Sequence, residues 1–147
     1  MTKAIYFDMD GTIANLYGVE NWLECLRAYD ETPYENATVM LNMQVLARLL
    51  NKLQANGYHI GIISWLSKNS NIDYDTRVTQ AKKVWLNKHL HSVEFNEIKI
   101  VEYGTPKEMV VDYPQGILFD DEIQNRENWF GQAFDVHNII EILKELK

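Results

Sequence analysis

The sequence has little cysteine and no long apolar run, and each shortage excludes a class of protein. Cys25 is the single cysteine among 147 residues, so an internal disulfide and a cysteine-rich metal cluster are both excluded. No apolar run approaches the roughly 20 residues that a membrane-spanning helix needs, so we expect no membrane partner. The first apolar segment meets Asp8 too soon for a signal peptide, and a cytoplasmic setting is therefore the default expectation.

Positive charge is also in short supply. The chain has 14 Lys and Arg against 21 Asp and Glu, a net charge of -7. Most of its surface should repel polyanions, so we expect no bulk nucleic-acid binding. A small phosphorylated substrate remains compatible with this acidity if a local cation or metal ion neutralises it. The hydrophobic share of 46% and the length suit one globular domain with its own core.

Short apolar runs alternate with segments of helical periodicity along the chain. Strands are expected at 3–7, 58–63, 97–103, 116–119 and 132–136. Helices are expected at about 38–56, with Thr38 as N-cap, at about 75–89 and at 138–147, and a further helix start at 105–108. The inner face predicted for the second helix comprises Val78, Ala81, Val84, Trp85 and Leu86. This alternation predicts an α/β, Rossmann-like three-layer sandwich around a mostly parallel five-stranded sheet.

One segment, residues 14–37, breaks the alternation. It contains Trp22 and Leu26 at helical spacing and then Pro33. We predict a small helical cap insert over the end of the first strand, within a single domain spanning 1–147. Its aromatic side chains either stack on a base or pack the insert onto the body, and they are Tyr17, Trp22, Tyr29 and Tyr34.

Acidic residues follow two of the predicted strands. Asp8 and Asp10 leave the first strand together. Two carboxylates about 4 Å apart repel by roughly 4 kcal/mol at an effective dielectric constant of about 20. A divalent cation removes this repulsion, and ligands that are all oxygen favour Mg²⁺. Asp120 and Asp121 add carboxylates at the same edge of the sheet. The alternative is that the first pair only caps a turn before Gly11.

Two further residues suit phosphate binding. Ser64 ends the second predicted strand, where its hydroxyl could donate to a phosphate oxygen. Lys107 lies at a predicted helix start, where the helix dipole makes a positive charge unfavourable. Its charge is therefore expected to interact with another group, such as a phosphoryl group. An ordinary strand-end serine and an exposed lysine are the alternatives. Lys82 and Lys83 are rivals of Lys107, but they lie inside a predicted helix.

The order of these elements resembles the four motifs of the haloacid dehalogenase superfamily. Asp8-Met9-Asp10-Gly11-Thr12 follows the first strand, and Ser64, Lys107 and Asp120-Asp121 follow the next three. The resemblance implies an Asp8 nucleophile, with Asp10 as the acid that protonates the leaving oxygen and then activates water. It further implies phosphate binding by Thr12, Ser64 and Lys107, and a Mg²⁺ site formed by Asp8, Asp10, Asp120 and Asp121. For Asp10, the backbone carbonyl is a typical metal ligand of the family.

This resemblance implies a magnesium-dependent phosphomonoester hydrolase that forms an aspartyl-phosphate. The Asp-Met-Asp-Gly run is similar to that of the 5'-deoxyribonucleotidase branch, which favours a nucleoside monophosphate. A sugar phosphate, another metabolite and a polynucleotide end remain alternatives. The small insert departs from the larger caps of that branch, so the site either admits a larger partner or is closed by another subunit of a homo-oligomer. The non-enzyme alternatives are an inactive phosphate-binding relative and a receiver domain, whose middle strand would end in aspartate rather than Ser64.

Overall fold

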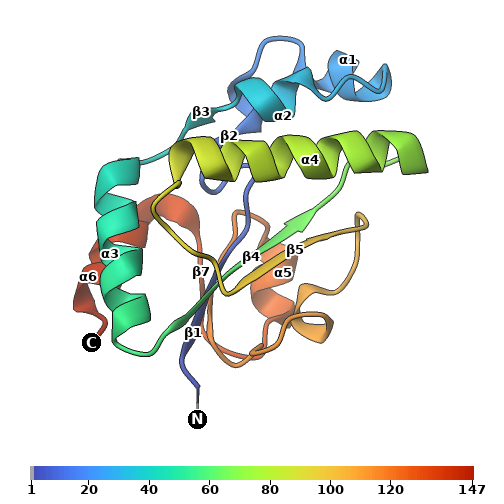
Figure 1. Ribbon diagram of the computed structural model, residues 1–147. Helices are drawn as coiled ribbons and strands as arrows, with labels where there is room; N and C mark the ends of the chain where they lie inside the picture. Colours follow the sequence, from blue (N-terminus) through green and yellow to red (C-terminus); the bar gives the residue numbers. More distant parts are fainter. Residues whose placement is uncertain (1) are drawn as a thin grey trace.

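A parallel five-stranded sheet forms the centre of the computed structural model, which describes residues 2–147 (Figure 1). The strands are ordered β5-β4-β1-β6-β7, and every neighbouring pair is parallel. Their bounds are β1 Ala4–Phe7, β4 His59–Trp65, β5 Glu97–Val101, β6 Ile117–Phe119 and β7 Ala133–Phe134. The predicted α/β class and its five-stranded sheet are confirmed.

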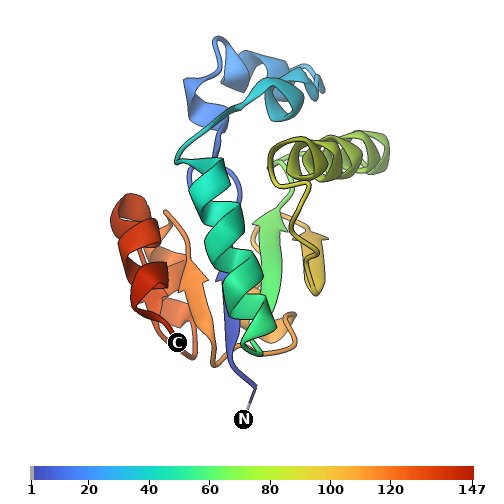
Figure 2. The same ribbon diagram turned by 60° about the vertical axis from the view of Figure 1, so that its left-hand side comes forward.

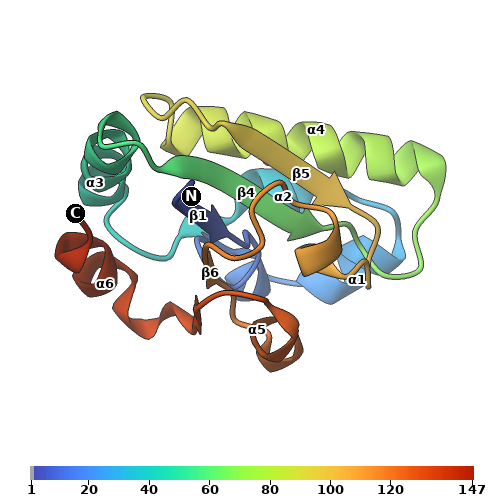
Figure 3. The same ribbon diagram turned by 90° about the horizontal axis from the view of Figure 1, so that it is seen from below.

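Both faces of the sheet are buried. In β1, Ile5 and Phe7 point into one core and Ala4 and Tyr6 into the other, as alternation along a strand requires. The larger core packs under α3 (Met43–Ala55), α4 (Ile72–His89) and α6 (Ile139–Glu145). The smaller core is covered by the segment 102–116 and by Trp129 after α5 (Ile123–Asn128). Figure 3 shows the molecule from below, with α3 and α6 on one side of the sheet and α5 on the other.

Side-chain caps decide where the two long helices begin. The side chain of Asn42 caps α3, so the prediction that Thr38 is its N-cap is wrong. The side chain of Asn71 caps α4, which therefore begins earlier than the predicted Asp75. Asparagine accepts hydrogen bonds from the free amides of a first helical turn, so both starts have a local physical cause.

Other local predictions also fail. The helix start expected at 105–108 is one 3-10 turn, η2 (Lys107–Met109), and α5 was not predicted. Val84, expected on the inner face of α4, is 52% exposed, whereas Lys82 is 1% exposed. A lysine can be buried in this way because its stem is apolar and only its tip needs polar partners. Within residues 2–147, no helix combines the length and the apolarity needed to cross a membrane.

The insert lies above the carboxyl ends of the strands and rests on α4 (Figures 1 and 2). It folds into short elements: β2 Ala14–Asn15, η1 Leu16–Gly18, α1 Trp22–Arg27 and α2 Thr32–Asn36. β3 (Thr38–Val39) follows and pairs antiparallel with β2. Leu16 and Tyr34 from this segment pack in one cluster with Val78 of α4. These contacts hold the insert above the carboxyl edge of the sheet, where the predicted site residues converge.

Candidate active site

A tight turn after β1 carries the first acidic pair. The backbone amide of Asp8 donates to the carbonyl of Phe119 at 2.9 Å, which fixes the start of the turn to β6. Gly11 has a φ of 81°, a left-handed conformation that glycine adopts without steric cost. A Cβ at Gly11 would overlap Oδ2 of Asp121. Glycine at this position therefore lets the turn approach the acidic residues that follow β6.

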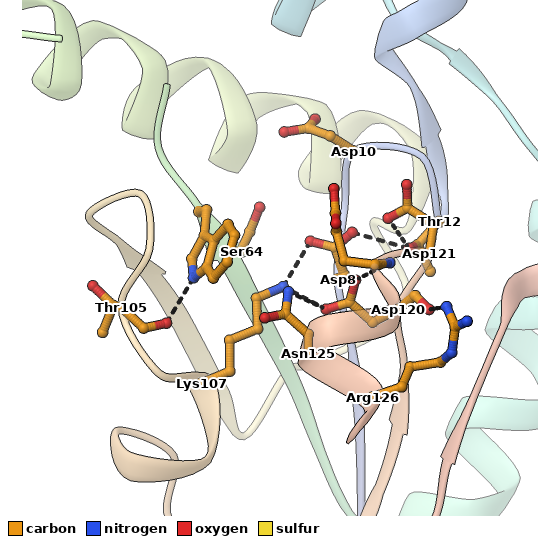
Figure 4. A network of polar contacts seen from close by, with 12 residues as sticks. Asp8, Asp10, Thr12, Ser64, Thr105, Lys107, Asp120, Asp121, Asn125 and Arg126 are labelled. Atoms are coloured by element: carbon orange, nitrogen blue, oxygen red, sulfur yellow. Dashed lines mark hydrogen bonds and ion pairs between the residues drawn. The ribbon is translucent and has the colours of Figure 1, made fainter. Parts of the chain in front are cut away.

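The turn after β1 and the end of β6 bring three carboxylates together, and η2 adds a lysine. Asp8, Asp120 and Asp121 each offer an oxygen, and these oxygens lie within 4.8 Å of one another. Nζ of Lys107, which is 2% exposed, lies 3.0 Å from Oδ1 of Asp8 and 2.7 Å from Oδ2 of Asp120. The Thr12 hydroxyl donates to Oδ2 of Asp8 at 3.0 Å (Figure 4). These predicted site residues, far apart in sequence, form one cluster.

The carboxylates outnumber the cation that neutralises them. Burial and the nearby Asp8 charge raise the pKa of Asp120 to about 6 and that of Asp121 to about 8. Burial alone would lower the pKa of Lys107, but the charges of Asp8 and Asp120 hold that pKa above its usual value. The cluster thus has an excess of negative charge and oxygen donors close together, which is the environment that a divalent cation such as Mg²⁺ suits.

Asp120 and Asp121 differ in how far the protein already uses their oxygens. Asp120 is fully buried and accepts hydrogen bonds from Lys107, from the Glu122 amide at 2.9 Å and from Asn125 at 3.1 Å. Asp121 has a long contact of 3.4 Å with the Thr12 hydroxyl. Asp121 therefore keeps more of its oxygen capacity for a metal ion, while Asp120 anchors Lys107.

A second buried lysine reaches the same edge from α4. Nζ of Lys82 lies 2.9 Å from Oδ2 of Asp10, and it donates to Oγ of Ser64 and to the carbonyl of Trp65, each at 2.7 Å. Sequence reasoning ranked Lys82 behind Lys107 because of its place inside a helix, yet the structure brings both lysines to the site. Its spacing of four residues from both Val78 and Leu86, two predicted inner-face residues, was the signal that pointed to burial.

Asp10 and Ser64 thus surround Lys82, while the other predicted site residues gather around Lys107. The Asp10 carboxylate lies outside the group of carboxylate oxygens that could hold a metal ion. Burial raises the pKa of Asp10, and the charge of Lys82 acts in the opposite direction. The two aspartates of the first motif therefore occupy different electrostatic environments.

A cavity of about 510 Å³ opens between the insert and the carboxyl edge of the sheet. Asp8, Asp10, Asp121 and Lys107 line it on the sheet side. Its aromatic walls come from both parts of the chain and comprise Tyr17, Trp22, Tyr29, Tyr34, Trp65 and Tyr103. The size and the mixture of apolar walls with few convergent polar groups suit a small organic ligand.

Comparison with protein-family models finds no match, and neither does comparison with curated proteins. Among solved structures, D,D-heptose 1,7-bisphosphate phosphatase from B. bronchiseptica, complexed with magnesium and phosphate, has a TM-score of 0.52 and 13% identity, covering 86% of this chain and 74% of that one. The corresponding phosphatase from Burkholderia thailandensis has a TM-score of 0.49 and 14% identity, covering 86% and 70%. The chain therefore shares the α/β fold of the B. bronchiseptica phosphatase.

Proposed function

We propose that this protein is a magnesium-dependent phosphomonoester hydrolase whose nucleophile is the carboxylate of Asp8. The observation that carries the proposal is the position of Asp8, which lines the cavity 3.0 Å from Lys107 and beside Asp120 and Asp121. A nucleophile that attacks an anionic phosphoryl group needs neutralising charge around it. Lys107 supplies one charge, and the carboxylate cluster has the composition to hold Mg²⁺. The similar fold complexed with magnesium and phosphate supports this reading.

The reaction follows from two carboxylates with different environments. An oxygen of Asp8 attacks phosphorus as the bond from phosphorus to the ester oxygen breaks, and Asp10 gives its proton to that oxygen. Asp10, now ionised, takes a proton from water, which attacks the aspartyl-phosphate and releases inorganic phosphate. Asp8, Asp121 and the Asp10 carbonyl would hold Mg²⁺. The bound ion would neutralise the negative charge of the phosphoryl oxygens.

The surroundings of Asp10 suit both of its tasks. Burial raises its pKa, which favours the protonated form required to donate to the leaving oxygen. Lys82, 2.9 Å away, stabilises the ionised form required to activate water. Thr12 and Ser64 remain the proposed hydroxyl contacts to phosphate, alongside Lys107.

A nucleoside monophosphate is the substrate class that we propose first. The aromatic residues around the cavity offer faces and edges on which a base can stack, while the phosphate reaches Asp8. A sugar phosphate is the second candidate, since the similar fold with a TM-score of 0.52 is a D,D-heptose 1,7-bisphosphate phosphatase. A polynucleotide end fits less well, because the insert covers the edge of the sheet and the net charge is -7.

A substrate panel separates these candidates. Phosphate release would be measured with Mg²⁺ for nucleoside monophosphates, sugar phosphates and a 5'-phosphorylated oligonucleotide at equal concentrations. We expect the highest kcat/KM among the nucleoside monophosphates. If a sugar phosphate is turned over fast and no nucleotide is turned over, the nucleotide proposal is wrong. The phosphatase proposal then still stands.

A further inference from the structure

Tyr29 joins α1 to α2 in a backbone conformation that tyrosine rarely adopts. Its φ is 57°, in the left-handed region, where a side chain with a Cβ is strained and where glycine or asparagine is the usual residue. Its side chain lines the cavity and is 44% exposed. Tyr29 is thus an aromatic residue that faces the cavity from a helix-end position where glycine is the usual residue.

The end of α1 sets this conformation: the amide of Asp30 donates to the carbonyl of Cys25 at 2.8 Å and that of Tyr29 to the carbonyl of Leu26 at 3.1 Å, the pattern of a helix C-terminal turn. Contacts from α4 then hold this turn in place. Arg77 donates to the Tyr29 carbonyl at 2.9 Å and to both carboxylate oxygens of Glu31, at 2.9 and 3.0 Å. The Tyr74 hydroxyl donates to the Asp30 carbonyl at 2.9 Å. The rings of Tyr29 and Tyr74 meet edge to face, with centroids 5.6 Å apart. Three consecutive residues of the insert are therefore bound to two side chains on successive turns of one helix.

The same helix also holds the chemistry in place. Lys82 lies further along α4 and bonds the buried Ser64 and Asp10, which lines the cavity. The Tyr34 hydroxyl of the insert is hydrogen-bonded to Ser67, just beyond β4. A single rigid element thus sets the distance between the strained tyrosine and the reacting groups. The insert is seated on α4 as a fixed wall of the cavity.

We propose, on the basis of the proposed function, that Tyr29 is a specificity-determining residue that contacts the leaving group of the substrate. Its ring offers an apolar face to a planar group such as a nucleobase, beyond the phosphate held at Asp8. Arg77 is a positioning residue, because it bonds the backbone of Tyr29 from α4 and lies outside the residues that line the cavity. The strain at Tyr29 is the cost of placing an aromatic ring where asparagine would fit freely.

Tyr29→Asn tests the proposal, because asparagine accepts the left-handed conformation and lacks the ring. With thymidine 5'-monophosphate we expect KM to rise roughly tenfold, as the loss of an aromatic contact implies, while kcat changes little. With acetyl phosphate, which carries no ring, KM and kcat should match the wild type. Relief of the strain should keep the melting temperature close to that of the wild type although the contact with Tyr74 is lost.

Arg77→Ala should raise the KM for thymidine 5'-monophosphate in the same direction and leave turnover of acetyl phosphate unchanged. Arg48→Ala, an exposed arginine on α3, is the matched control and should change neither. If Arg77→Ala fails to fold, Tyr29→Asn decides alone. An unchanged KM in an active Tyr29→Asn protein would overturn this inference and leave the proposed function standing. Absence of turnover by the wild type with every substrate would overturn both.

Discussion

Two buried lysines divide the aspartates at the carboxyl edge of the sheet. Lys107 binds Asp8 and Asp120, and Lys82 binds Asp10. A buried ammonium group is costly unless carboxylates and other acceptors surround it, so each lysine depends on its own partners. In the proposed mechanism, this division places the nucleophile beside one cation, while Asp10, beside the other, changes its protonation state during turnover.

Removal of the second lysine should reveal this division. In Lys82→Met the stem is kept and the charge is lost, so the pKa of Asp10 rises further and less of it is ionised at neutral pH. We expect kcat to fall by roughly 100-fold, a typical contribution of a positioned acid–base group, and the pH optimum to move upward. Rapid-quench assays should show aspartyl-phosphate accumulating, because the water-activating step is the one that slows.

The neighbouring Lys83→Met is the control for this change. Lys83 is exposed, so its loss should leave the pH profile unaltered. A Lys82→Met protein with the wild-type kcat and the wild-type pH optimum would show that Asp10 does not depend on Lys82.

Among the elements, α4 has the most direct influence on the site. It carries Lys82 toward the sheet and Arg77 toward the insert, and its first turn is capped by Asn71. Removal of the cap acts on this helix without removing any side chain that lines the cavity. Its effect on stability can therefore be separated from effects on chemistry.

Asn71→Ala should lower the free energy of unfolding by about 1 kcal/mol, because the amide of Tyr74 loses its acceptor. Urea denaturation measures this loss directly. Asn71→Asp is the matched control, since aspartate accepts the same bond and its charge favours the helix N-terminus. Equal losses in both variants would contradict a capping role for Asn71.

The sequence predicted strands better than helix ends, for a physical reason. Strands buried on both faces are short apolar runs that end abruptly, as at Phe7 and Phe119, and such runs can be recognised locally. Helix starts depend on which of several capping residues is used, and Thr38 and Asn42 were both suitable. α5 is polar, and Asn125 and Arg126 tie it to Asp120 through contacts that no local pattern contains.

For the site, too, some residues could be placed from the sequence and others could not. Asp8, Lys107 and Asp120 could be placed together from sequence, because the carboxyl ends of parallel strands meet at one edge. The contact of Lys82 with Asp10 could not, since it depends on the rotation of α4 against the sheet. The left-handed conformation of Tyr29 at the end of α1 could not be predicted either, because glycine or asparagine is the usual sequence signal for such a helix end.

At the scale of the whole molecule, an acidic chain concentrates further negative charge at one edge of its sheet. The net charge is -7, and the cluster of Asp8, Asp120 and Asp121 adds mutual repulsion where the strands end. Such a cluster destabilises the folded protein unless protons or cations bind there. That the protein lies in the cytoplasm and forms a homo-oligomer are predictions from the sequence that the structure does not test.

Metal-free stability should therefore decrease as pH rises. The pKa of Asp120 is about 6 and that of Asp121 about 8 in the folded protein, above the value of about 4 for an unfolded aspartate. The folded state thus holds more protons than the unfolded state between about pH 4 and pH 8, so the stability gained from these protons is lost as pH rises through that range. Thermal unfolding in EDTA, from pH 5 to pH 9, measures the slope.

Mg²⁺ should reverse this trend, because it binds the ionised carboxylates and competes with protons. We expect the rise in melting temperature on adding Mg²⁺ to be larger at pH 8 than at pH 6, and to shrink in Asp121→Asn. A rise of the same size at both pH values would argue against metal binding at these carboxylates.

Phosphate release by the wild type and by Asp8→Asn, each with Mg²⁺ and with EDTA, tests most directly whether Asp8 is the nucleophile. Asparagine keeps the shape of the side chain and cannot form the acyl phosphate, so we expect turnover by the wild type with Mg²⁺ and by neither protein in EDTA. The Asp8→Asn protein should stay folded and inactive with Mg²⁺. Equal rates for the two proteins in the presence of Mg²⁺ would contradict an aspartyl-phosphate mechanism.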